Sequence, residues 1–244
     1  MIWTAALLST AALAAPSPAP YQAVLDQHLR QGRVDYAAIQ RTGALDGTLD
    51  GLAKATEPTA PAEKMAFWIN AYNALTIDLI ADEWPVSSIR DLDGGKVWDS
   101  RSFTVAGRAV TLNDIEHRIL RPMGDPRIHA AVNCASVGCP PLPAGAFTAA
   151  NLDAELTAAS RRWVASNGAS IDQAGGVVRL SRIFDWYGDD FVPRADRAIP
   201  GLDPKQAAAI DFLADHAEPA VATWLAGGGY RVEWQPYDWA VNAR

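Results

Sequence analysis

Residues 61–84 read PAEKMAFWINAYNALTIDLIADEW, and this stretch decides the fold. Pro61 stands where the first residue of a helix can be proline, because the N–H that proline lacks would have no partner there. Pro85 follows the stretch and stops the helix. The apolar residues lie on nearly every side of the predicted helix, which is typical of a helix that is buried all round. We therefore expect a central, buried helix of about six turns.

Shorter elements flank this central helix. Asp114 follows Thr111 by three residues, and the pair resembles a capping box with Asp in place of Glu, which opens a helix. Pro219 marks a break in a helical pattern near the C-terminus. The sequence predicts helices over residues 21–30, 44–55, 112–120, 149–166 and 203–225, a hairpin over 96–111, and strands over 176–183 and 230–234. This order indicates one α+β domain over residues 21–244, mainly helical, with a small antiparallel sheet.

Composition excludes several classes of protein. Of the 244 residues, 49% are hydrophobic and 20% are charged, as in a globular protein with a core rather than a disordered chain. The net charge is −7, and no cluster of Lys and Arg is present that would displace counterions from phosphates, so we expect no nucleic-acid partner. The sequence also lacks a phosphate loop, a G-x-S-x-G elbow, an H-E-x-x-H motif and a dinucleotide fingerprint, and we predict no cofactor.

The first twenty residues, MIWTAALLSTAALAAPSPAP, carry no charged side chain and are rich in Ala and Leu. Their apolar run is too short to span a bilayer as a stable helix. Ala12-Leu13-Ala14 fits the small-x-small pattern of a signal-peptide cleavage site. The sequence therefore predicts a signal peptide over residues 1–14 and a Pro-rich mature N-terminus over 15–20. We expect an exported protein, periplasmic or secreted, with no transmembrane segment in its mature chain.

Both cysteines lie in the stretch RIHAAVNCASVGCPPL, residues 127–142. An oxidising compartment favours a disulfide between Cys134 and Cys139, which would close a small loop. Alternatively Cys134 is a nucleophile, because a thiol becomes reactive when a base or a helix N-terminus lowers its pKa. His129 lies five residues before Cys134 and is the candidate base. No metal site is predicted, since C-x4-C is at the edge of zinc-ligand spacings and no second close pair exists.

Polar residues on two predicted helices are further candidates for the same site. Asn70 and Asn73 are three apart and share one side of the central helix, where each buried amide needs hydrogen-bond partners. They either bond neighbouring backbone or orient a catalytic imidazole. His117 is the alternative base, and Asn73 or Glu116 is the predicted orienting residue. The other interpretation of the second helix is a solvated, capped helix start with an Asp114–His117 pair.

Aromatic and acidic side chains gather in the stretches IFDWYGDDF, residues 183–191, and YDW, residues 237–239. They either fill the core or line a groove in which the rings stack on a sugar or peptide ligand. Asp185, Asp189 and Asp190 could serve as an acid, a base or a cation-binding group, although their spacing matches no EF-hand loop. The candidate binding residues are Asn70, Asn133, Ser136, Cys139, Asp185, Trp186, Tyr187, Asp190, Tyr237, Asp238 and Trp239.

Five stretches carry a family resemblance, and they occur in the order AFWINAYNALTI, IEHRILR, DPRIHAAVNCASVGCPPL, RIFDWYGDDF and YDWAVN. With these stretches the chain resembles the domain-of-unknown-function family 547 from about Tyr21 to Asn242. The His-Asn-Cys-Ser-Cys-Pro-Pro block is the most specific part, and Val241 stands where members often show Leu. The resemblance implies an exported bacterial member of a family that also occurs inside plant proteins. That family resembles a distant relative of papain- and transglutaminase-like thiol enzymes.

The resemblance bears on the two cysteines as well. Plant members work in a reducing compartment and look to share the paired-cysteine block, which favours a functional thiol. The leading hypothesis is a thiol-dependent hydrolase or acyl transferase that acts on an amide or thioester in a peptide or envelope component. Cys134 would be the nucleophile, and backbone N–H groups after it would hold the oxyanion. The alternative is a non-catalytic module, stapled by a Cys134–Cys139 disulfide, that binds a protein or a ligand such as a small molecule or a peptide.

Overall fold

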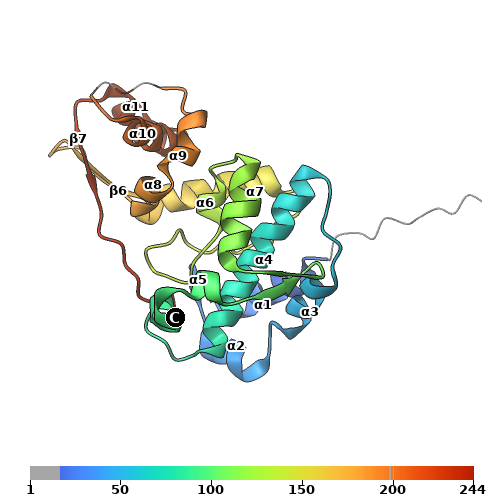
Figure 1. The fold of residues 1–244 in the computed structure, drawn as a ribbon. Helices are drawn as coiled ribbons and strands as arrows, with labels where there is room; N and C mark the ends of the chain where they lie inside the picture. The colour runs from blue at the N-terminus through green and yellow to red at the C-terminus, as the bar shows by residue number, and fades with distance from the viewer. Residues whose placement is uncertain (1–16, 198, 200) are drawn as a thin grey trace, which may run out of the picture.

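The computed structural model describes residues 17–197, 199 and 201–244, so the predicted signal peptide lies outside the described residues. The described chain forms a mainly helical α+β domain, as predicted. Helix α4 runs through the middle of the molecule, with α1 to α3 beside it and α8 to α11 at the other end, next to β6 and β7 (Figure 1). Among the described residues, no helix is both long enough and apolar enough to cross a membrane.

The helices and strands alternate along the whole described chain. The longer helices are α1 (Ala19–His28), α2 (Tyr36–Thr42), α3 (Asp46–Lys54), α4 (Pro61–Asp82), α7 (Leu152–Trp163), α10 (Pro204–His216) and α11 (Pro219–Gly227). The short helical segments are η1 (Ile89–Gly95), α5 (Val97–Ser100), η2 (Asp114–Leu120), η3 (Arg121–Met123), α6 (Ile128–Ala131), η4 (Val164–Gly168), α8 (Arg182–Trp186), α9 (Gly188–Phe191) and η5 (Val192–Arg194). The strands are β1 (Leu29–Arg30), β2 (Arg33–Val34), β3 (Phe103–Val105), β4 (Arg108–Val110), β5 (Ala169–Asp172), β6 (Val177–Leu180) and β7 (Arg231–Trp234).

The predicted central helix is confirmed as α4. Pro61 occupies its first turn, and the helix ends at Asp82, just before the Trp84–Pro85 peptide bond. Fifteen residues of α4 are buried, and they lie on all sides of it. Adjacent side chains on a helix point about 100° apart, yet the neighbours Trp68 and Ile69 are both fully buried. The helix is therefore surrounded by protein, and other elements can bring side chains to several of its faces.

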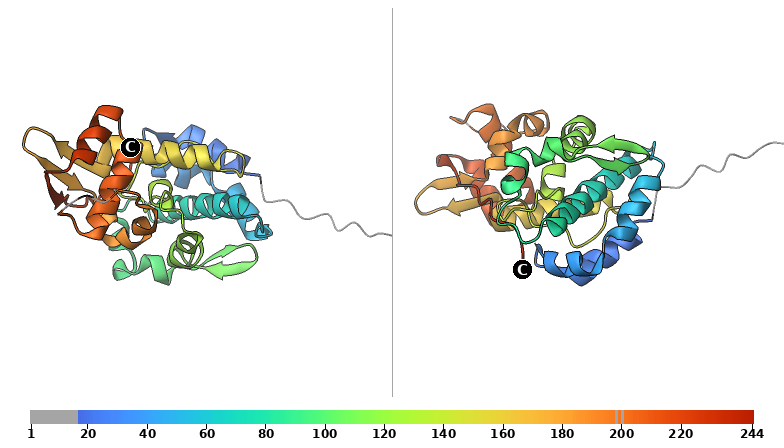
Figure 2. Two further views of the ribbon diagram at one scale, coloured as in Figure 1. Left: turned by 90° about the horizontal axis from the view of Figure 1, so that it is seen from above. Right: turned by 60° about the horizontal axis from the view of Figure 1, so that its bottom comes forward.

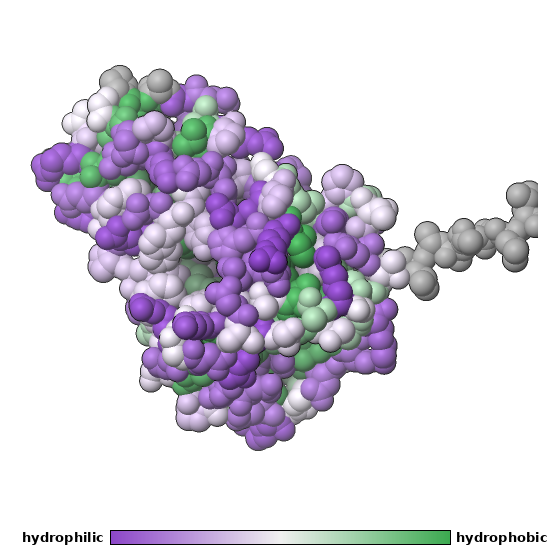
Figure 3. Space-filling model, viewed as in Figure 1, coloured by the Kyte–Doolittle hydropathy of each residue, from purple (hydrophilic) through white to green (hydrophobic). Residues whose placement is uncertain are grey.

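Two hydrophobic clusters make up the core. The larger one surrounds α4 and includes residues of α1 to α3 and η2. The smaller one surrounds α10 and includes residues of α7, β6, α8 and α9. Helix α6 belongs to both, since Ile128 and Ala131 lie in the first cluster and Ala130 lies in the second. The cysteine-bearing segment that follows α6 therefore passes between the two clusters, where the molecular surface is hollowed (Figure 3).

The sheets are small, and one pairing differs from the prediction. Strands β3 and β4 form an antiparallel hairpin, and β5 pairs with β6 in the same sense. Strand β7, however, pairs with β6 in parallel, with Val178 opposite Val232. The reason is the connection, because α8 to α11 intervene between β6 and β7 and return the chain to the same end. Figure 2 shows this three-stranded sheet with α10 and α11 at one end of the molecule.

The predicted hairpin over residues 96–111 begins too early. Residues Val97–Ser100 form the helical turn α5, and only Phe103–Val105 and Arg108–Val110 are extended. Arg101 explains the difference, because its guanidinium bonds Asp93 at 2.8 and 2.9 Å and Glu83 at 2.8 Å and so ties the turn back toward α4. Trp98 and Asp99 are thereby held on a helical turn.

The C-terminal segment joins the two clusters. After β7 the chain runs back in an extended form to end beside the N-terminal half (Figure 1). The backbone N–H of Val137 donates to Ala240 at 2.8 Å, and the N–H of Asn242 donates to Ala135 at 3.0 Å. Val34 N–H in turn donates to Asn242 at 3.0 Å. Through these backbone hydrogen bonds, the last residues hold the cysteine-bearing segment next to β2.

Candidate active site at the paired cysteines

The cysteine-bearing segment is a tight loop built around Asn133. The Asn133 side chain is 4% exposed, and its Oδ1 accepts the N–H of Ala135 at 2.7 Å while its Nδ2 donates to Pro140 at 2.8 Å. Ala135 has φ +60°, in the left-handed region. The side-chain bond of Asn133 holds the backbone in this conformation, which costs a non-glycine residue about 1 kcal/mol or more. The loop therefore turns sharply between Cys134 and Cys139.

A pocket of about 270 Å³ opens beside this loop. Its walls come from α4, α5, η2, α6, the cysteine loop, α8 and the C-terminal segment, so both hydrophobic clusters contribute. The lining residues are Tyr72, Trp98, Asp99, Asn113, Glu116, His117, His129, Val132, Cys134, Cys139, Ile183, Trp186, Tyr187, Tyr237 and Trp239. Most of the residues that the sequence suggested for a site are thus brought together, although they are spread over more than 160 positions.

Both cysteines are free thiols and their sulfurs lie close together. The N–H of Cys134 donates to Sγ of Cys139 at 3.1 Å. The Tyr237 hydroxyl lies 3.1 Å from Sγ of Cys139 and 3.3 Å from Sγ of Cys134, and it bonds the Ser136 hydroxyl at 2.8 Å. Cys139 is 6% exposed, whereas Cys134 is only partly buried. Cys134 is therefore the thiol that a molecule in the pocket would meet first.

The two thiols titrate as a pair. Burial raises the pKa of Cys139, but hydrogen bonds from the Cys134 thiol, the Tyr237 hydroxyl and the Cys134 N–H outweigh it and lower the pKa to about 7. The pKa of Cys134 is raised well above its usual value, first by its bond to Cys139 and then by burial. One negative charge is therefore shared over the pair near neutral pH, and a second is strongly disfavoured.

His129 is held by a carboxylate. Its ring is 3% exposed and stacks on Tyr187 with a centroid distance of 4.4 Å. Nε2 lies 2.8 Å from Oδ2 of Asp190, and Arg121 bonds the same carboxylate at 2.6 and 3.0 Å. Burial raises the pKa of Asp190, but the bonds from His129 and Arg121 hold it well below its usual range. An ionised carboxylate only accepts, so Nε2 carries the proton and Nδ1 is the basic nitrogen of the neutral ring.

The predicted orienting residues do not bond this imidazole. Asn73 is 2% exposed, donates to the Ala131 carbonyl at 2.8 Å and accepts from the Asn133 N–H at 2.9 Å. Glu116 accepts the Tyr72 hydroxyl at 3.1 Å in the pocket wall. Asn73 therefore satisfies two backbone groups at the C-terminal end of α6. Asp190, which the sequence suggested only as a binding residue, takes the orienting position.

His117 lies in the pocket but is engaged by an arginine. Its Nδ1 is 2.7 Å from Nη1 of Arg121, and because a guanidinium only donates, this nitrogen accepts that bond. The predicted Asp114–His117 pair does not form. Asp114 instead exchanges two 3.0 Å bonds with Thr111, as the capping box predicts, and pairs with Arg118 at 3.1 Å. His129 is therefore the better placed of the two histidines to accept a proton.

Aromatic rings form one wall of the pocket. Trp186 stacks on Trp239 at 5.8 Å and Tyr237 lies 4.5 Å from Trp239, measured between ring centroids. Trp98 meets Trp239 edge-on at 6.1 Å. Trp186 is 45% exposed, an unusual fraction for so large an apolar side chain. We refer to Trp98, Trp186, Tyr237 and Trp239 as the aromatic wall.

Three of the suggested acidic residues lie away from the pocket lining. Asp185 pairs with Arg182 at 2.6 Å, and Asp189 pairs with Lys205 at 2.9 Å. Asp238 bonds the Ala240 N–H at 2.9 Å on the C-terminal segment. These carboxylates bond neighbouring side-chain or backbone groups outside the pocket.

Sequence reasoning missed several residues of the site. Tyr72 reads as core, and Trp98 and Asp99 lie in a segment that was expected to be extended. Asn113 lies next to the capping box, and Arg121 belongs to no sequence motif that would have marked it as a site residue. The 3.6-residue period could have paired His117 with Arg121, since residues four apart on a helix are neighbours.

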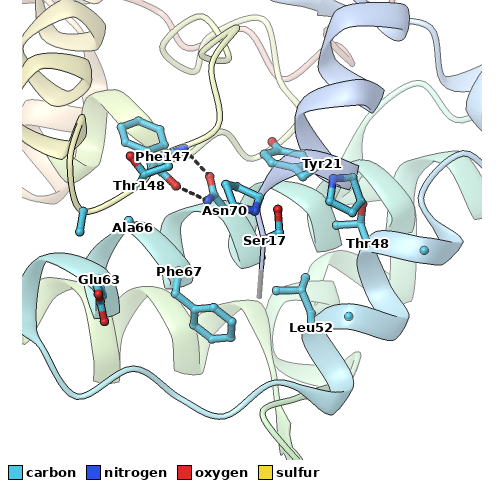
Figure 4. Close-up of a pocket in the computed structure, with 15 residues that line it drawn as sticks. Ser17, Tyr21, Thr48, Leu52, Glu63, Ala66, Phe67, Asn70, Phe147 and Thr148 are labelled. Atoms are coloured by element: carbon cyan, nitrogen blue, oxygen red, sulfur yellow. Dashed lines mark hydrogen bonds between the residues drawn. The ribbon is translucent and has the colours of Figure 1, made fainter. Parts of the chain in front are cut away.

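Asn70 points to a different place from Asn73. Its amide exchanges two bonds with the backbone of Phe147, at 2.8 and 2.9 Å, at the edge of a second pocket (Figure 4). The two asparagines therefore serve separate regions, although they are three residues apart.

Metal-ligating residues do not gather in the described part of the chain, where no group of three or more His, Cys, Asp or Glu side chains could hold an ion.

Comparison with known proteins gives one positive result. Residues 57–164, which include α4, η2 and the cysteine loop, match the family described as "Protein of unknown function, DUF547".

The match is shorter than the resemblance, because the stretches around Trp186 and Trp239 lie beyond it. No curated protein and no solved structure matches the chain significantly, so similarity to papain- and transglutaminase-like enzymes stays a prediction. The family prediction itself is confirmed: residues 57–164 match the model of DUF547, a family of proteins of unknown function.

Proposed function

We propose that this protein is an exported thiol-dependent hydrolase or acyl transferase, with Cys134 as its nucleophile. One observation carries the proposal: the accessible thiol of Cys134 and the carboxylate-held imidazole of His129 line the same pocket. A thiol, a base and a third group that orients the base are the parts that covalent acyl transfer needs. Asp190 supplies the third group.

The reaction would run in two stages. As Sγ of Cys134 attacks the carbonyl carbon of an amide or thioester, the remaining proton of the thiol pair rests on Cys139. Collapse of the tetrahedral intermediate breaks the bond to the leaving group, which takes the proton of Cys139 by way of Nδ1 of His129. Water, or an acceptor amine, alcohol or thiol, then loses a proton to Nδ1 of His129 and attacks the thioester, which frees Cys134.

The oxyanion would be held by hydroxyls. The sequence predicted backbone N–H groups after Cys134, but those of Ala135, Val137 and Gly138 are already bonded to protein acceptors. The hydroxyls of Ser136 and Tyr237 lie 3.2 and 3.3 Å from Sγ of Cys134 and can both donate. Such donors contribute about 3 kcal/mol each when they point at the developing charge.

The compartment and the substrate class rest on the sequence. The uncharged, Ala- and Leu-rich N-terminus supports export. N-terminal sequencing of protein recovered from the periplasm tests this part, with a new N-terminus near Ala15 as the expected result. The same protein recovered in the cytoplasm with Met1 intact would contradict it.

A binding module is the second candidate, and the aromatic wall favours it. Exposed Trp and Tyr rings beside a pocket are typical of ligand recognition. In that case Cys134 and Cys139 would be joined as a disulfide in the exported protein, and the pocket would hold a small molecule or a peptide without chemistry.

One experiment separates the two candidates. The reduced mature protein is screened against a panel of fluorogenic thioesters and amides, with Cys134→Ala as the test variant and Ser166→Ala, on an exposed hydroxyl of η4, as the matched control. Turnover that Cys134→Ala abolishes and Ser166→Ala retains, with a trapped acyl-enzyme on intact mass, supports the hydrolase. Ligand binding by both variants, without turnover and with a persistent disulfide in the native protein, supports the module instead.

A further inference from the structure

The charge in the pocket beside the cysteines is one-sided. Asp99 and Glu116 contribute carboxylates to its lining, whereas no Lys or Arg of the described chain lines it. The thiol pair adds a negative charge near neutral pH. The guanidinium of Arg121 lies outside the lining and bonds Asp190 at 2.6 and 3.0 Å, so its charge is already balanced. The pocket therefore attracts cations and repels anions.

Glu116 keeps one carboxylate oxygen available to a ligand. The side chain is 7% exposed and lines the pocket, and its Oε2 accepts the Tyr72 hydroxyl at 3.1 Å. Oε1 bonds no described residue, and it is not one of the fully enclosed atoms without a partner, which are Thr48 Oγ1 and Trp163 Nε1. Oε1 therefore has accessible surface, and a donor in the pocket can reach it. Such a donor would stabilise a carboxylate that is otherwise short of partners.

Asp99 is a second carboxylate without a partner. It is exposed, lines the pocket next to Trp98 on α5, and makes no side-chain hydrogen bond or ion pair with a described residue. Asp93 on the neighbouring η1 is, by contrast, bonded to Arg101 at 2.8 and 2.9 Å. Arg101 thus neutralises Asp93 and leaves Asp99 unpaired at the pocket.

The aromatic wall offers ring faces to the same ligand. The face of an indole or phenol ring attracts a cation, and rings combined with a carboxylate are typical of sites that bind ammonium groups. Arg90 already uses the wall in this way, since its guanidinium lies over the Trp239 ring at 5.0 Å from the centroid. Trp186, which is 45% exposed, is the ring with most surface left for a ligand.

We propose that the substrate of the candidate site carries an ammonium group, which the pocket holds against the aromatic wall and the carboxylates of Asp99 and Glu116. The inference rests on the proposed function only in calling the bound molecule a substrate. The pocket volume of about 270 Å³ exceeds the roughly 150 Å³ of a cavity that accepts benzene, so an alkylammonium group fits beside the bond that Cys134 attacks.

The test compares two probes of equal shape. Choline and neohexyl alcohol differ only in that a carbon atom of the alcohol replaces the nitrogen, so one is a cation and the other is neutral. Their affinities for the reduced mature protein are measured by isothermal titration or by NMR shifts at one ionic strength. We expect choline to bind about tenfold more tightly, although the neutral probe is the easier one to remove from water.

Three variants test the location. Glu116→Gln removes the charge but still accepts the Tyr72 hydroxyl, and Trp186→Leu removes the ring face at an exposed position; each should lower the preference for choline to about threefold or less. Asp91→Asn, at an exposed carboxylate of η1 outside the lining, is the matched control for a lost negative charge and should leave the preference unchanged.

Three results would overturn the proposal. They are equal or weaker binding of choline by the wild-type protein, a preference that survives both Glu116→Gln and Trp186→Leu, and an equal loss of preference in Asp91→Asn. Neither probe has a carbonyl group, so the measurement needs no turnover. A choline preference in a protein that cleaves no thioester or amide would count against the enzyme and would still support a cation site.

Discussion

At the scale of single residues, the thiol pair depends on Tyr237. Its hydroxyl lies within 3.3 Å of both sulfurs, and it comes from a segment about one hundred residues away in the chain. A donor that bonds the thiolate more strongly than the thiol favours the charged form. Reactivity near neutral pH should therefore be a property of the tyrosine hydroxyl as much as of the cysteines.

Tyr237→Phe tests this dependence. We expect the alkylation rate of Cys134 at pH 7 to fall about fivefold, because the loss of one hydrogen bond of about 1.4 kcal/mol to the charged form raises the pKa of the pair by about one unit from its value of about 7. The ring stays in the aromatic wall, so the fold should be retained. Tyr230→Phe, whose hydroxyl bonds the Leu225 carbonyl away from the site, is the control and should change nothing in alkylation. An unchanged rate in Tyr237→Phe would exclude this role of the hydroxyl.

Asp190 should stabilise the protein in a pH-dependent way. Its pKa is lowered in the fold, so its contribution is complete above the unfolded value near 4 and is lost as the pH falls through the lower folded value. Asp190→Asn should therefore lower the free energy of unfolding by about 2 kcal/mol at pH 7, and by less at pH 3. Urea denaturation at both pH values measures it. Asp189→Asn, one residue earlier and exposed, should have little effect, and an equal loss in both variants would contradict the assignment.

At the scale of elements, the sequence was most informative where residues next to the ends of a helix set its boundaries. Pro61 and the Trp84–Pro85 step bracket α4, and Thr111 with Asp114 opens η2 as predicted. Prediction was weakest for short elements. Strand β5 is paired only because β6 lies beside it, and the parallel pairing of β7 depends on the intervening helices. A local sequence pattern carries no information about which distant strand a segment will pair with.

The last turns of α4 contain an unfavourable charge. Burial and the carboxylates of Asp82 and Asp46 raise the pKa of Asp78 to about 7. Asp78 and Asp82 are four apart at a helix C-terminus, where like charges repel each other and the helix dipole disfavours an anion. The folded state therefore binds a proton that the unfolded state releases, and stability falls as the pH rises from about 4 to about 7.

Asp78→Asn mimics the protonated form and should remove this loss. We expect it to raise the free energy of unfolding by about 1 kcal/mol at pH 8, a value reduced for the partial exposure of the side chain, and to have no effect at pH 4. Thermal unfolding at the two pH values checks it. Asp50→Asn, at an exposed ion pair on α3, is the control. A stabilisation that is equal at both pH values would show that charge is not the cause.

At the scale of the whole molecule, the candidate site exists only where the two hydrophobic clusters meet. The sequence identified Cys134, His129, Trp186 and Tyr237 as candidate site residues, but it did not indicate that they line one pocket. It also could not find Asp190 as the partner of His129, because 61 residues separate them and no periodicity extends across helices. What joins these parts is the path of α6 between the clusters and the return of the C-terminal segment.

Removal of residues 237–244 tests this joining role. The truncation deletes the backbone bonds to Val34, Ala135 and Val137, along with the Tyr237 hydroxyl. We expect a loss of about 4 kcal/mol in the free energy of unfolding, or about 10 °C in Tm, together with loss of fast alkylation at pH 7. Removal of residues 243–244 alone should keep the reactivity. A truncated protein with unchanged alkylation would show that the thiols do not need this segment.

The central claim is that Cys134 is a nucleophile activated near neutral pH. The most direct measurement is the rate of iodoacetamide alkylation of the reduced native protein from pH 5 to pH 10, with peptide mapping to identify the modified sulfur. The account predicts that Cys134 is modified ahead of the buried Cys139, with a rate that reaches half its plateau near pH 7, because the pair loses its first proton there. A rate that still rises above pH 9, as for an ordinary thiol, or alkylation confined to Cys139, would contradict it.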